Sequence, residues 1–150
     1  MSSNEPKKNQ VQWPLSFVLQ EEQITTGMWQ TSQWLLQDIL LSEKDVEGTI
    51  CKATLHLHRD ERTDYRFNLS SVNPKLFVVL ETTGQATISI HDVTVSQSVA
   101  GHYLDGDYLV LSKEMPLAIQ AWVEAFIGRN GELLEQRRKK RKGAGRSSGK

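Results

Sequence analysis

The chain has 150 residues, 38% of them hydrophobic, and its 18 basic side chains balance its 18 acidic ones. Folded chains of about this length bury roughly 68–70% of their unfolded surface, so we expect one compact domain and exclude two large ones. The zero net charge argues against wholesale coating of nucleic acid. The single cysteine excludes an internal disulfide and any zinc site built from several cysteines.

Charge is distributed unevenly along the chain. Residues 129–150 carry nine basic and two acidic side chains, a net charge of +7, so the remaining nine basic and 16 acidic side chains give −7. A segment this polar cannot bury enough apolar surface to offset its ordering entropy. We therefore expect a flexible N-terminus over 1–12, one β-rich domain with a C-terminal helix over 13–130, and a basic helical extension with a disordered tail over 131–150.

The sequence shows neither a membrane span nor a secretion signal. The longest uninterrupted apolar run, residues 76–80, is far shorter than the roughly 20 residues that cross a bilayer. Residues 1–10 are polar and lack the apolar stretch of a signal peptide. We therefore expect a cytoplasmic protein with no membrane partner.

Alternation of apolar and polar side chains predicts strands, because it places one set on a core and the other in water. The first runs over 15–19 after Pro14, which suits a strand start because it has no amide donor to place. Residues 29–41 match both a helical i, i+4 spacing and a strand buried on both faces. We favour the strand, because the neighbouring segments are strands with short connections.

A hairpin is expected in the middle of the chain. Residues 50–59 alternate, 60–64 form turns, and Tyr65, Phe67 and Leu69 alternate again, which predicts two strands joined by a five-residue loop.

Three further strands and a helix follow the hairpin. Residues 76–80 are apolar on both faces, as in a central strand, and strands at 87–95 and 108–111 follow. Pro116 suits the first turn of a helix whose apolar stripe is Ala118, Trp122, Ala125 and Phe126. The predicted fold class is α+β: six or seven mainly antiparallel strands in a barrel or strongly bent sheet, closed by this C-terminal amphipathic helix.

One histidine-rich segment has a spacing that metal sites use. His56, His58 and Asp60 lie at i, i+2 and i+4 of a predicted strand, and two imidazoles with a carboxylate bind zinc or non-haem iron in some proteins. His91 and His102 could converge on them, but the spacing does not place them there. A solvated strand face is the simpler interpretation, so we predict neither a metal nor a cofactor.

The sequence also gives no catalytic residue. On a strand, Cys51 and His56 point to opposite faces, so the thiolate–imidazole pairing that activates a nucleophile is not supplied locally, and Cys51 fits a small buried residue. None of the 10 glycines lies in a phosphate-binding loop between a strand and a helix.

Two segments are candidates for binding a partner. If Tyr65 and Phe67 face inward, then Arg66, Asn68 and Ser70 form an outward row of polar groups. This row could dock an extended peptide or an anion, or it could be the ordinary polar face of a strand. The second candidate is a basic run that could bind an acidic protein or nucleic acid, fold back on the acidic body, or stay solvated; it consists of Arg137, Arg138, Lys139, Lys140, Arg141 and Lys142.

Several short motifs together resemble a small bacterial family, domain-of-unknown-function family 3305. They lie at residues 55–61, 64–71, 76–80, 92–95, 103–107, 115–116 and 121–123. Members are often labelled molybdopterin-guanine dinucleotide biosynthesis protein A, and the family is associated with molybdenum-dependent formate dehydrogenases. The label implies a guanylyl transfer that needs a glycine-rich nucleotide loop, which this β-rich sequence lacks.

Three functions are compatible with these observations. The first is a non-catalytic accessory protein in molybdenum cofactor or formate dehydrogenase maturation, which binds a molybdoenzyme subunit or maturation factor through a strand edge or the polar row. The second is a cofactor-biosynthesis enzyme with His56, His58, Asp60 or Arg66 at its site. The third is nucleic-acid binding through the basic run.

Overall fold

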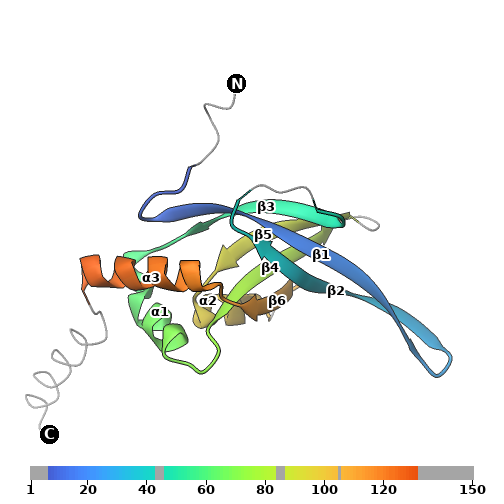
Figure 1. Cartoon of the computed structure of the whole chain (residues 1–150). Coiled ribbons are helices and arrows are strands. Elements are labelled where there is room, and N and C mark those ends of the chain that lie inside the picture. The colour runs from blue at the N-terminus through green and yellow to red at the C-terminus, as the bar shows by residue number, and fades with distance from the viewer. Residues whose placement is uncertain (1–6, 43–45, 84–86, 105, 132–150) are drawn as a thin grey trace, which may run out of the picture.

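A computed structural model describes residues 7–42, 46–83, 87–104 and 106–131. Within them, the chain forms strands, one short 3-10 turn and three α-helices, an α+β fold as the sequence predicts. Figure 1 shows how the strands and α-helices are arranged. The elements are β1 (Gln12–Thr26), β2 (Trp29–Leu40), β3 (Thr49–His56), η2 (Arg59–Glu61), α1 (Arg62–Leu69), β4 (Lys75–Thr83), β5 (Thr87–Thr94), α2 (Gln97–Tyr103), β6 (Leu109–Glu114) and α3 (Leu117–Asn130).

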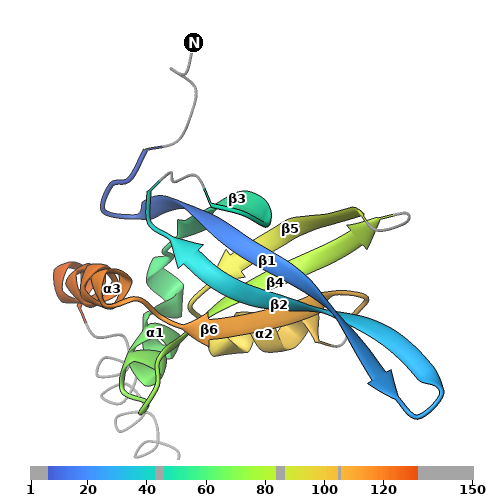
Figure 2. The ribbon, with the colours of Figure 1, turned by 45° about the vertical axis from the view of Figure 1, so that its right-hand side comes forward.

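The strands form two antiparallel three-stranded sheets rather than one barrel. The first has the order β2-β1-β3 and the second β5-β4-β6, so β1 and β4 are the central strands. The predicted central position of residues 76–80 is therefore confirmed. Strands β3 and β5 lie next to each other without a hydrogen-bonded ladder between them, so the described strands form no closed barrel (Figure 2).

One core joins the two sheets and the helices. Leu15, Phe17 and Leu19 of β1 point into this core, and so do Leu76, Val78 and Leu80 of β4. β4 is also buried on its other face, because α2 packs on the second sheet there. This double burial explains why the segment is apolar throughout.

Helix α3 begins where the sequence predicts, with Pro116 at its N-cap, but its buried face is different. Ala118 and Ala125 of the predicted stripe are exposed, and the buried residues are Ile119, Trp122, Val123, Phe126 and Ile127. Helix α3 packs on α1, and its Trp122 meets Trp13 of β1 edge-on, with ring centroids 5.3 Å apart. The helix thus anchors the first strand, whereas the predicted closure of a barrel is not observed.

The predicted second strand of the hairpin is wrong, since residues 62–69 form helix α1. The helix buries Arg62, Tyr65 and Asn68, which are three positions apart, while Phe67 is 67% exposed. The Tyr65 hydroxyl accepts a hydrogen bond from the His58 backbone N–H (2.8 Å) and donates one to Glu61 (2.8 Å). All three buried residues carry polar groups that are hydrogen-bonded within the fold, so the alternation of apolar residues predicted a strand period where the buried residues follow a helical one.

Helix α2 was not predicted at all. The side chain of Ser96 caps it by accepting a hydrogen bond from the Val99 N–H (3.2 Å), and Ala100 is buried against the sheet. None of the helices in the described part of the chain has the length and apolar composition that a membrane span requires.

Candidate functional site

The predicted polar row does not exist as a row. On an α-helix successive residues turn by about 100°, so positions i and i+2 point to nearly opposite sides. Arg66 donates two hydrogen bonds to the carboxylate of Glu124 on α3, at 2.9 and 2.7 Å. Asn68 is buried, and Ser70 is exposed at the end of the helix.

The buried side chain of Asn68 joins neighbouring elements by hydrogen bonds. Its side-chain N–H groups donate to the carbonyls of Lys75 (2.7 Å) and Val95 (2.9 Å), and its oxygen accepts from the Lys75 N–H (2.9 Å). The residue therefore ties α1 to the start of β4 and to the residue that follows β5.

The histidines are not gathered into a metal site in the part of the chain that the structure describes. Strand β3 ends at His56, and Asp60 lies in η2, so the predicted one-faced spacing is lost. Instead, Nδ1 of His91 lies 3.5 Å from a carboxylate oxygen of Glu81, and its ring packs on Tyr108, with centroids 4.5 Å apart. No group of three or more His, Cys, Asp or Glu side chains is placed to hold a metal among the described residues.

Cys51 lies on β3 opposite Phe17 of β1 and is half-buried. Burial raises the pKa of its thiol, because a thiolate loses hydration there. The side chain packs against the core but is only partly buried, whereas the sequence predicts a buried residue. The basic run of residues 137–142 lies outside the described residues.

The surface that stands out is a hairpin that sequence reasoning missed. Strands β1 and β2 continue past the body as a two-stranded arm, which we define as residues 20–35 (Figures 1 and 2). Its pairs run from Gln20↔Leu35 to Thr26↔Trp29, and none of its residues is buried. An isolated two-stranded hairpin is only marginally stable in water, so this arm gains little from its own packing.

The tip of the arm is apolar. Gly27 takes a positive φ of 62° in the two-residue turn, a conformation that glycine adopts without strain. The next two side chains, Met28 and Trp29, are 97% and 76% exposed. Large apolar side chains this open at the end of a projection are typical of contact sites.

The outer edge of the arm is unprotected. Strand β2 lies at the edge of its sheet, and residues 29–35 contain neither a charge nor a proline. Protein edge strands usually carry lysine, proline, a bulge or a cover that prevents pairing with another chain. The register shift in the β1–β2 ladder lies inward of the arm, at Val18 and Leu19, and leaves residues 29–35 regularly paired with β1.

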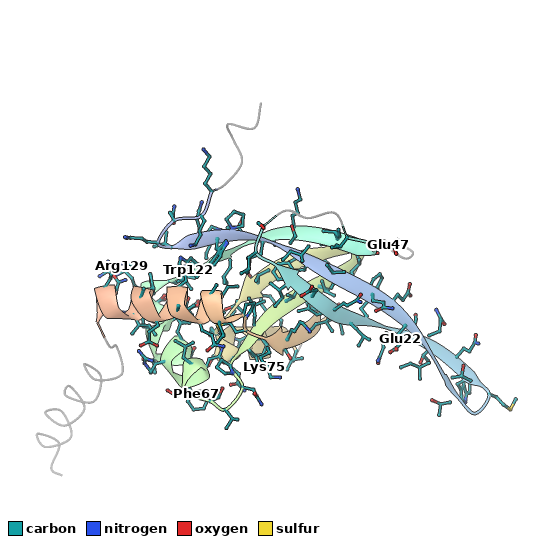
Figure 3. All side chains as sticks on the ribbon, in the orientation of Figure 1. Glu22, Glu47, Phe67, Lys75, Trp122 and Arg129 are labelled. Atoms are coloured by element: carbon teal, nitrogen blue, oxygen red, sulfur yellow. The ribbon has the colours of Figure 1, made fainter. Side chains whose placement is uncertain are left out.

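The arm is also purely acidic. Residues 9–42 contain no Lys, Arg or His, and their charged side chains are Glu21, Glu22 and Asp38. Figure 3 shows Glu22 on the projecting part. The cation-free stretch and the charge-free strand are both visible in the sequence, and together they were the signal for this surface.

A family model described as "protein of unknown function (DUF3305)" matches residues 14–141, which include all of the described strands and helices except the first two residues of β1. A comparison with the curated proteins found no match, and neither did one with the solved structures.

Proposed function

The chain belongs to the family of proteins of unknown function DUF3305, and we propose that it is a non-catalytic accessory protein whose arm binds an extended segment of a partner protein. The observation that carries this proposal is the open edge of β2 at residues 29–35. An edge strand offers a row of backbone donors and acceptors to which an extended segment adds as a further strand.

The tip supplies side-chain anchors at one end of that edge. Tryptophan is enriched among the residues that carry most binding energy, and methionine adapts to irregular apolar surfaces. Backbone hydrogen bonds along β2 would give affinity for an extended segment of any sequence. Met28 and Trp29 would select segments that bring an apolar pocket to the tip.

The charge of the arm selects the chemistry of the partner. With two acidic side chains, Glu21 and Glu22, and no basic one, the arm favours a positively charged segment. Such complementarity raises the association rate and weakens as salt screens it. The proposed occupant is therefore an extended basic segment of another protein.

The biological setting that we propose is the cytoplasmic maturation of a molybdoenzyme such as formate dehydrogenase. Its support is the label that similar family members carry, and the partner would be a subunit of that enzyme or a maturation factor.

The test measures binding of the purified chain to purified formate dehydrogenase catalytic subunit by calorimetry. We expect Met28→Ala with Trp29→Ala to weaken binding at least tenfold. The matched control, Val72→Ala with Leu117→Ala, removes side chains that are 94% and 80% exposed elsewhere and should leave binding unchanged.

Hydrogen exchange locates the contact. Binding should slow exchange of the backbone amides of residues 29–35 and leave those of β5, the edge strand of the other sheet, unchanged. Equal binding by the tip variant and wild type would refute the arm as the site, and no binding to the subunit would refute that subunit as the partner. Guanylyl transfer from GTP by the purified chain would overturn the non-catalytic proposal.

A further inference from the structure

A cleft of about 980 Å³ lies between the segment before β1, the turn η2 and the end of α3. Its polar wall is formed mainly by Arg59, Arg62, Arg129, His58 and Asp60. In Figure 1 this end of α3 lies on the opposite side of the molecule from the arm. We propose that the cleft binds the phosphate group of a small phosphorylated organic molecule.

Arg62 is the fixed element of the wall, since only 7% of it is exposed. Its Nε donates to the carbonyl of Arg59 (2.6 Å), and its Nη1 donates to the carbonyls of Asn130 and of Gly131, the latter at 2.8 Å. These carbonyls at the end of α3 hold the guanidinium plane in place and carry only partial negative charge. Its Nη2 donates no hydrogen bond to any described residue, so one side of the fork remains available.

The cleft has an excess of positive charge. Three arginines face one carboxylate, Asp60, and none of the three forms an ion pair with a described residue. Arg59 and Arg129 are exposed, and Arg129 donates to the carbonyl of Gln10 (3.2 Å). A buried cation without a counter-ion is costly, and an oxyanion in the cleft would supply the missing charge.

The chemistry of the side chains favours phosphate. Guanidinium groups present paired N–H donors that match the oxygens of a phosphate, and an arginine already held in plane loses little entropy when it binds.

The cleft is larger than a phosphate ion, and it has an apolar side formed by Val11, Leu57 and Phe126. Small-molecule sites typically measure about 300–1,000 Å³ and combine apolar walls with a few polar groups. We therefore assign the phosphate to the arginines and the organic part of the ligand to the apolar side.

The test uses three probes at low ionic strength: phenyl phosphate, inorganic phosphate and phenol. Calorimetry and amide chemical shifts should show phenyl phosphate binding at least tenfold more tightly than inorganic phosphate, with shifts at Leu57 and Phe126, and no binding of phenol. Equal affinity for the two phosphates would overturn the organic part of the proposal. No binding of either phosphate would overturn the site.

Charge-neutralising variants decide whether the arginines are responsible. Arg59→Gln with Arg129→Gln should weaken phenyl phosphate at least tenfold, and both side chains are exposed, so the variant should fold. Lys75→Gln removes an exposed cation well away from Arg129 (Figure 3) and should change nothing. Equal loss in both variants, or in neither, would overturn the assignment. The variants leave the arm intact, so failure here is separable from failure of the proposed function.

Discussion

Strands β4 and β2 are both rich in apolar side chains, yet β4 is covered on every side and the outer half of β2 is open. In β4, Leu76, Val78, Val79 and Leu80 are 0% exposed, and both edges are bonded to neighbouring strands. In β2, residues 29–35 include no buried residue, and one edge is unpaired. Apolar composition therefore predicts that a segment forms a strand. The position of that strand in the sheet decides whether other parts of the same chain cover it.

This contrast separates stability from binding. Apolar side chains in β4 contribute to folding, because burial removes them from water. Side chains of the arm are not buried in the fold and contribute little to its stability, so burying them against a partner would contribute to the free energy of binding. Substitutions in β4 should therefore lower the free energy of unfolding, whereas substitutions in the arm should change it little.

The largest expected effect is in the covered strand. Leu80→Ala leaves a cavity in the core and should lower the free energy of unfolding by about 2–5 kcal/mol, measured by urea denaturation. The matched substitution Leu35→Ala, in the arm at 37% exposure, should cost less than about 1 kcal/mol. Equal losses at the two positions would break the comparison.

The next largest effect is expected at Asn68, the buried polar side chain that ties α1 to the start of β4. Asn68→Ala removes the partner of three hydrogen-bonding groups, the N–H and carbonyl of Lys75 and the carbonyl of Val95. We expect a loss of about 1–3 kcal/mol in urea denaturation, because these groups lose their partner where water is scarce. Ser70→Ala, two residues on and exposed, is the control and should be nearly neutral. A neutral Asn68→Ala would mean that water replaces the side chain.

A smaller effect is expected at the exposed pair between α1 and α3. The Arg66 guanidinium holds the pKa of Glu124 below its usual range. A carboxyl group with a lowered folded pKa stabilises the fold above its unfolded pKa, and this stabilisation is lost as pH falls through the folded pKa. Since Glu124 is 56% exposed, screening limits the contribution to at most about 1 kcal/mol.

The measurement is the difference in unfolding free energy between wild type and Glu124→Gln as a function of pH. The gap should be present at neutral pH and disappear in acid. Glu114→Gln, an exposed carboxylate on β6, serves as the control. A gap that grows in acid would contradict the assigned sign.

The smallest expected effect is at the tip of the arm. Met28→Ala with Trp29→Ala should change the free energy of unfolding of the isolated chain by no more than about 0.5 kcal/mol, because both side chains are already in water. Thermal and urea unfolding both report this difference. A loss above about 1 kcal/mol would show that the tip packs on the body, and it would remove the contrast with β4.

The strands were predictable because their periodicity is set by burial. Residues 76–80 are apolar as a strand buried on both faces requires. Leu15, Phe17 and Leu19 face the core as alternation predicts, but Ser16 and Val18, which it places in water, are buried as well. The predicted strand over 29–41 is β2. Helix α1 was not predictable in this way, because it buries Asn68 for its hydrogen bonds and leaves Phe67 exposed. Ser96, a residue type that favours helix N-caps, indicated the start of α2, but the alternating residues before it favoured a strand.

The candidate site was missed for a related reason. An apolar strand in sequence gives no sign of whether another element will cover it, so residues 29–41 were predicted as a strand buried on both faces, whereas residues 29–35 include no buried residue. The partner-binding role predicted for Arg66, Asn68 and Ser70 depended on a strand that is a helix. The role predicted for residues 137–142 stays a prediction.

The contact between β1 and α3 has a consequence for synthesis of the chain. The Trp122 indole N–H donates to the carbonyl of Asn9 at 2.8 Å, across 113 positions of sequence. At a ribosomal rate of about 5–20 residues per second, Trp13 waits roughly 6–20 seconds before the ring that covers it exists. A chain stalled in that interval lacks the ring that packs on Trp13, so its core is incomplete until α3 has been made.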